Sequence, residues 1–181
     1  MKKLSNILDE SVWGGMLDRS VGDTIRKEDD LTNIRELVPV DMGVSVLWAD
    51  RDLEYKDGND SSYFAYEEVE DIVKKSEWRI PTKNEFYELY KYTRMIKNTD
   101  EVFVTEGDFD DSPQLIFYKK GYMYGDNPDT INHISHYCAW TSTPYEPEGY
   151  YMIEIEHHQI SKFVPMHKGN RVCVRLVKDR K

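Results

Sequence analysis

The spacing of apolar residues predicts two helices near the middle of the chain. Tyr66, Val69, Ile72 and Val73 recur at helical intervals, which predicts a first helix over about residues 65–76. A second helix should begin after Pro81, because Thr82 and Glu85 have the spacing of a Thr-x-x-Glu capping box. Its apolar face should continue to about Lys97 through Phe86, Leu89, Tyr90, Thr93 and Ile96.

Alternating apolar positions predict short strands on both sides of this helical region. Before it, Val44, Val46 and Trp48 alternate over one strand. The run 121–132 is rich in turn-forming residues and is interpreted as a loop. After the second helix, strands are expected within residues 102–104, 114–118, 137–143, 151–156, 160–164 and 172–176. Two helices followed by antiparallel strands predict an α+β fold.

Residues 1–38 differ in composition from residues 39–181, and we expect them to form an N-terminal arm ahead of one domain. A charged stretch with few apolar residues occupies positions 18–30, so the arm cannot bury itself. Two interpretations stay open: an arm that orders on a partner or a neighbouring subunit, and a short helix packed on its own domain. For the first, the expected docking residues are the apolar ones around Trp13, namely Leu4, Ile7, Leu8, Val12, Trp13, Met16 and Leu17.

The overall charge and hydropathy exclude some classes of partner. The formal net charge of −10 repels phosphate backbones, so we expect no nucleic-acid binding. We also expect no membrane span, because the sequence lacks a run of 18 apolar residues. The polar, acidic stretch after Met1-Lys2-Lys3 does not have the pattern of a signal peptide, which predicts synthesis as a soluble cytoplasmic protein.

The residues with catalytic or metal-binding chemistry are few. Cys138 and Cys173 lie in predicted strands, where two buried free thiols are favoured, although a disulfide stays open if those strands are adjacent. His133 and His136 would share a helical face, but no third ligand is evident in the sequence, so we interpret them as a surface pair. We therefore expect no catalytic residue, no bound metal and no cofactor.

Several short motifs together resemble one family. In chain order they are Val40–Ala49, Tyr63–Glu68, Trp78–Phe86, Trp140–Pro144 and Val174–Val177. These segments, over about residues 40–178, resemble the C-type-lectin-like domain of the Fibrobacter-type major paralogous domain. The resemblance implies a C-type-lectin-like α+β fold. The Trp-Asn-Asp stretch of calcium-dependent sugar binders is absent from this sequence, which disfavours a calcium site.

The same resemblance suggests where a ligand would bind. In lectin-like folds the late loops and strands form the exposed face, and tyrosine rings stack well on sugars and on protein partners. The expected exposed ligand-binding residues are therefore Tyr124, Tyr145, Glu148 and Tyr150.

The N-terminal arm carries a second resemblance. Met1–Gly14 together with Arg26–Asp30 resembles the leader of structural proteins of crAss-like tailed phages of gut Bacteroidales. This implies a non-enzymatic virion protein, a head fibre or capsid decoration, located on the virion surface. Its arm would dock on the capsid or another virion protein, and a homo-oligomeric domain would face host glycan. The alternatives are a bacterial lectin-like binding module and an enzyme of the formylglycine-generating type that uses the two cysteines.

Overall fold

The computed structural model describes residues 33–56, 62–99, 101–107, 113–125, 127–147, 149–156 and 159–181. Within these ranges the chain forms two short helices, α1 (Tyr66–Val73) and α2 (Lys83–Tyr92). The remaining elements of the described chain are strands: β1 (Pro39–Val40), β2 (Val46–Ala49), β3 (Thr93–Asn98), β4 (Val102–Gly107), β5 (Gln114–Tyr118), β6 (Tyr122–Tyr124), β7 (Asn127–Asn132), β8 (Tyr137–Tyr145), β9 (Gly149–Glu156), β10 (Gln159–His167), β11 (Arg171–Val172) and β12 (Val177–Asp179).

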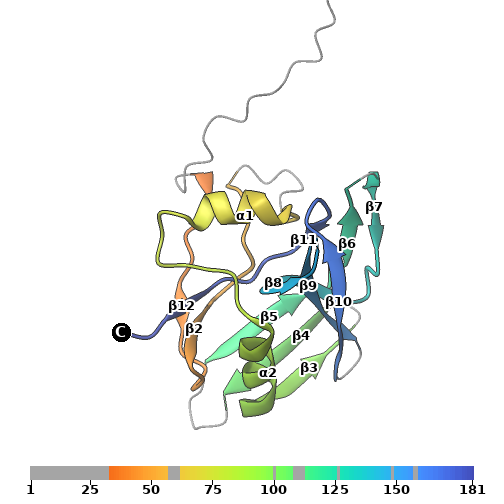
Figure 1. Ribbon diagram of the computed structural model, residues 1–181. Helices are drawn as coiled ribbons and strands as arrows, with labels where there is room; N and C mark the ends of the chain where they lie inside the picture. Colours follow the sequence, from red (N-terminus) through yellow and green to blue (C-terminus); the bar gives the residue numbers. More distant parts are fainter. Residues whose placement is uncertain are drawn as a thin grey trace, which may run out of the picture.

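The strands named above pair into four small sheets, each of three strands. Their orders are β1-β2-β12, β3-β4-β5, β11-β6-β7 and β10-β9-β8, and the neighbours within each sheet are antiparallel. Figure 1 shows α1 and α2 at opposite ends of the view, with the strands between them. The closing strand β12 joins β2 on the side away from β6 and β7, so the two ends of the described chain meet in one sheet.

The prediction of an α+β, C-type-lectin-like fold class is wrong, because the described chain is mostly antiparallel β-structure. Two segments account for the difference. Residues 93–98, expected as the last turns of the second helix, form β3, which pairs with β4. Residues 121–132, expected as a loop, form β6 and β7, which pair with each other.

The predicted helix starts are confirmed. α1 lies within the expected range, and the carboxylate of Glu68 accepts a hydrogen bond from the backbone N–H of Ala65 at 2.9 Å. At α2, Thr82 Oγ1 accepts from the N–H of Glu85 at 3.2 Å, and Glu85 Oε2 accepts from the N–H of Thr82 at 2.6 Å. This reciprocal pair satisfies two backbone donors that a helix leaves without intrahelical partners.

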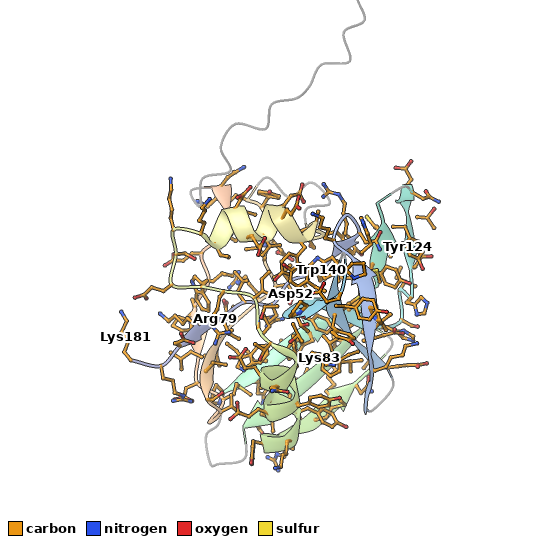
Figure 2. All side chains as sticks on the ribbon, in the orientation of Figure 1. Asp52, Arg79, Lys83, Tyr124, Trp140 and Lys181 are labelled. Carbon is orange, nitrogen blue, oxygen red and sulfur yellow. The ribbon has the colours of Figure 1, made fainter. Side chains whose placement is uncertain are left out.

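The β8-β9-β10 sheet separates two hydrophobic clusters, which is why β8 and β9 are apolar on both faces. Cys138, Trp140 and Met152 belong to the cluster that includes Phe64, Tyr66 and Val69. The alternate residues of β8 and β9, including Tyr137, Ala139, Ile153 and Ile155, belong to the cluster around Trp48, Phe86 and Phe117. The indole N–H of Trp140 donates to the carbonyl of Phe64 at 2.9 Å, and Figure 2 shows Trp140 in the interior.

The described chain is part of this core from near its first residue. Ile34 is buried in the Trp140 cluster and pairs with Tyr55, so the packed domain reaches back before residue 39. Among the described residues, no helix has the length and apolar character needed to cross a lipid bilayer.

Candidate functional site

The predicted ligand-binding tyrosines do not share one environment. Tyr124 ends β6, is 43% exposed, and packs edge-to-face on Tyr122, whose hydroxyl lies 3.0 Å from its own. Figure 2 shows Tyr124 beside the β6–β7 pair, at the edge of the molecule. Tyr150 is only partly buried rather than exposed, and its ring stacks on Tyr66 with the centroids 3.4 Å apart. Glu148 lies outside the described residues, as do the arm residues Leu4, Ile7, Leu8, Val12, Trp13, Met16 and Leu17.

Tyr145 belongs to a group of contacting aromatic rings that we call the tyrosine patch. Tyr145 is 44% exposed and packs edge-to-face on Tyr151 at 5.5 Å. The ammonium group of Lys83 lies 3.9 Å from the centroid of the Tyr151 ring and 4.9 Å from that of Phe163. Tyr87, 51% exposed, contacts Phe163 at 4.8 Å. The patch therefore consists of Lys83, Tyr87, Tyr145, Tyr151 and Phe163, and it combines aromatic faces with one cation.

The start of α2 is fixed against β8, and this places Lys83 in the patch. The backbone N–H of Lys83 donates to Thr143 Oγ1 at 3.0 Å, and the N–H of Ser142 donates to the Pro81 carbonyl at 2.8 Å. Lys83 is labelled beside α2 in Figure 2. A cation over an aromatic face is favourable by roughly 0.5–1 kcal/mol at exposed sites. The arrangement can bind a ligand that offers both a flat apolar face and hydroxyl or anionic groups.

A second group of polar side chains surrounds Glu154 of β9. Glu154 Oε1 lies 2.6 Å from His136 Nδ1 and 3.0 Å from His133 Nδ1, and the two Nδ1 atoms are 3.2 Å apart. The Glu154 side chain is 3% exposed, that of His136 is 12% exposed, and that of His133 is 43% exposed. A metal ion could be held by the imidazoles of His133 and His136 together with the buried carboxylate of Glu154.

A tight turn between β7 and β8 brings the two histidines together. The N–H of His136 donates to the His133 carbonyl at 2.8 Å, and the N–H of Gly121 donates to the His136 carbonyl at 3.0 Å. His133 has a φ of +53°, a left-handed conformation that is uncommon for a residue with a Cβ. Gly121 is required at its position, because a Cβ there would lie 2.0 Å from the Asn132 carbonyl oxygen.

Glu154, the third member of this group, was not predicted from the sequence, where it lies within the strand expected over residues 151–156. The structure buries both faces, and Glu154 is paired with Cys138 on one side and Lys162 on the other. The available signal was an acidic residue within the apolar run Tyr151-Met152-Ile153-Glu154-Ile155, since a buried carboxylate needs compensating partners.

Both cysteines are buried and free, as the favoured interpretation predicted. Burial raises the pKa of the Cys138 thiol, and it raises the pKa of the Cys173 thiol well above the usual range. A thiol is a nucleophile or metal ligand only when ionised, so both groups are poorly suited to catalysis at neutral pH.

Two hollows lie near the cores. An apolar pocket of about 210 Å³ lies between α2, β9 and the β3-β4-β5 sheet. A polar cleft of about 530 Å³ is lined by charged side chains that include Asp50, Arg51 and Asp52. Asp52 is 3% exposed, and its Oδ2 has no hydrogen-bond partner among the described residues.

No family model, curated protein or solved structure matches this chain.

Proposed function

We propose that this protein is a non-enzymatic structural component of a tailed-phage virion, either a head fibre or a capsid decoration protein. In this proposal residues 1–30 of the N-terminal arm dock on the capsid or on another virion protein, and the β-rich domain is displayed outward as a homo-oligomer. The observation that carries the proposal is the resemblance of Met1–Gly14 and Arg26–Asp30 to the leader of crAss-like phage structural proteins. An arm with one aromatic anchor, a few aliphatic residues and flanking charges is also suited to docking in a partner's groove.

The displayed domain would contact host glycan through the tyrosine patch. Tyrosine rings stack on the apolar faces of sugars, and Lys83 adds a donor for hydroxyl or anionic substituents. A single such patch binds weakly, and many copies on one particle raise the effective affinity.

The enzyme alternative is less well supported, because the only two thiols of the chain are buried and their pKa values are raised. The bacterial binding-module alternative differs from our proposal in location. It predicts that the protein is found on cells whether or not phage particles are present.

Electron microscopy with gold-labelled antibodies tests the location directly. Antibodies raised against the folded domain should label intact, purified phage particles at regular positions on the head. Antibodies against a cytoplasmic host protein serve as the control for adhering debris. Labelling of uninfected cell surfaces, with unlabelled particles, would contradict the proposal and favour the binding module.

Glycan binding is tested on an array of surface polysaccharides from Bacteroidales hosts. Tyr145→Ala should weaken binding about fivefold, because a stacked ring contributes on the order of 1 kcal/mol. Tyr92→Ala is the matched control, since Tyr92 is 52% exposed at the end of α2 and is not a member of the patch. Equal binding by both variants and the unmodified protein would exclude the patch as the glycan site.

A further inference from the structure

We infer that His133, His136 and Glu154 bind one divalent transition-metal ion, with zinc as the best match to these ligands. The inference concerns the β-rich domain alone and does not depend on the virion role. Two imidazole nitrogens and one carboxylate form a donor set that suits zinc and its first-row neighbours. Calcium and magnesium prefer sites made of oxygen ligands, so they fit this donor set poorly.

The separations of the donor atoms agree with a single ion. With bonds of about 2.1 Å, adjacent ligands lie about 3.0 Å apart on an octahedral ion and about 3.4 Å apart on a tetrahedral one. The three observed separations are 3.2 Å between the two Nδ1 atoms, 3.0 Å from His133 to Glu154 Oε1, and 2.6 Å from His136 to the same oxygen. The first two separations match these values, and the third is shorter, so His136 and Glu154 would move apart by about 0.4 Å to seat an ion.

The surroundings of His136 provide an acceptor for the proton of the metal-binding tautomer. Its Nε2 lies 3.3 Å from Glu156 Oε1, so a proton on Nε2 would point toward the Glu156 carboxylate. A neutral imidazole with its proton on Nε2 presents the lone pair of Nδ1 toward Glu154. In that tautomer an ion shared by Nδ1 and Glu154 Oε1 replaces the direct hydrogen bond that a proton on Nδ1 would make across their 2.6 Å contact. A carboxylate behind the ligating imidazole is a common feature of zinc sites, where it orients the ring and raises its basicity.

The charges around the group also favour a bound cation. Glu154 is almost fully buried, and the ammonium group of Lys162 is 3.6 Å from its Oε2, on a side chain that is 57% exposed. A buried carboxylate is costly unless it is well compensated. A divalent ion at Oε1 would add a full counter-charge beside this partly exposed lysine.

The site would be open on one side. His133 is 43% exposed, so the coordination positions beyond the three protein ligands are accessible to water or to a donor group of a ligand. The ion would also join the β7–β8 turn to β9. Because the three ligands come together only in the folded domain, the bound ion would stabilise the folded state.

The test uses the full chain without a histidine tag, stripped of metal by a chelator and then dialysed. Zinc is titrated in and followed by calorimetry, and cobalt is added separately as a spectroscopic probe of nitrogen ligation. We expect one zinc ion per chain, an increase in the thermal unfolding temperature, and a cobalt spectrum that zinc abolishes. His133→Ala is the principal variant, because His133 is the most exposed ligand and its removal poses the least risk to folding.

The variants separate the site from other zinc binding. Glu156→Gln removes a partner that only orients His136, and it should weaken zinc binding roughly 10- to 100-fold. His133→Ala and Glu154→Gln each remove a ligand, and each should weaken zinc binding by more than this. His167→Ala, in β10 and outside the group, should leave the affinity unchanged. Circular dichroism establishes that each variant is folded.

Two results would overturn the inference. The absence of zinc binding at millimolar concentration would mean that the three residues form a hydrogen-bonded cluster held by protons alone. Zinc binding that is equal in the unmodified protein and in His133→Ala would place the ion elsewhere on the chain. A calcium or magnesium titration in place of zinc should produce no effect that depends on the histidines.

Discussion

Arg175 illustrates how single buried charges hold the domain together. Its Nε donates to Asp52 Oδ1 at 2.7 Å, and its other nitrogens donate to the carbonyls of Ala49 at 3.1 Å and Ile116 at 2.6 Å. The guanidinium group also lies 4.4 Å from the centroid of the Phe117 ring. One side chain thus links β2, β5 and the segment before β12.

Removing the carboxylate of this pair should be strongly destabilising. Asp52→Ala leaves a fully buried guanidinium without its counter-charge, and we expect a loss of about 3–5 kcal/mol in the free energy of unfolding. Urea denaturation measures this loss. Lys168→Met is the matched control, because it removes an ion pair with Glu67 that is exposed on both sides, and its unfolding midpoint should hardly change. Similar midpoints for both variants would show that the buried pair does not organise the core.

Single residues were also where the sequence was least informative about the site. The His133-x-x-His136 spacing was visible in the sequence, but the third partner, Glu154, lies in β9, about twenty positions further along the chain. Only the pairing of β8 with β9 brings Glu154 beneath the two imidazoles. Such long-range pairing depends on the whole sheet and leaves no local pattern.

At the scale of elements, the start of α2 was predictable because its signals are local. Thr82, Glu85 and the preceding Pro81 lie within five positions, and the structure contains the expected capping box. The end of α2 was not predictable. Thr93 and Ile96 continue the helical spacing, yet both lie in β3, which pairs with β4. Thr93 Oγ1 donates to the Leu89 carbonyl at 2.6 Å where the helix ends. Strand pairing overrides the local pattern there.

The capping box also predicts a pH dependence of stability. Burial alone would raise the pKa of Glu85, but hydrogen bonds from Arg79 and from the Thr82 N–H lower it below its usual value. A carboxyl group whose pKa is lower in the folded state stabilises the protein above its unfolded-state pKa of about 4.3, and this contribution disappears as the pH falls through the lowered value.

Glu85→Gln tests this dependence, because it keeps the shape of the side chain and removes only its charge. We expect a loss of about 1–2 kcal/mol in the free energy of unfolding at neutral pH, from the weakened charged hydrogen bonds. The difference from the unmodified protein should shrink as the pH falls below about 4. Glu70→Gln, on the exposed face of α1, is the control. A difference that stays constant into the acidic range would exclude ionisation of Glu85 as the cause.

At the scale of the whole molecule, local signals predicted most strands but not the fold class. The strands β5, β8 and β9 lie close to their expected ranges, since their apolar residues are dense and β-branched or aromatic. The final strand expected over residues 172–176 is also wrong, because β11 ends at Val172 and β12 begins at Val177. Among the segments that were missed as strands, β3 and β7 are polar and exposed along much of their length. Their structure comes from neighbouring strands rather than from their own composition, and together they change the domain from α+β to mostly β.

The proposed role divides the molecule into two parts with separate tasks. Residues 1–30 would provide docking, and the β-rich domain would provide the outer surface. This division predicts that the two tasks can be lost independently, since the packed core of the domain begins near Ile34.

The most direct test of docking through the arm is whether the protein still enters phage particles after residues 1–30 are deleted. The truncated and full-length proteins are supplied in turn to a phage that lacks its own copy, and the amount per purified particle is quantified. We predict that the truncated protein stays folded, with an unchanged unfolding midpoint, and is absent from the particles. The full-length Tyr124→Ala variant should be incorporated normally. Incorporation of the truncated protein at the full-length level would contradict docking through the arm.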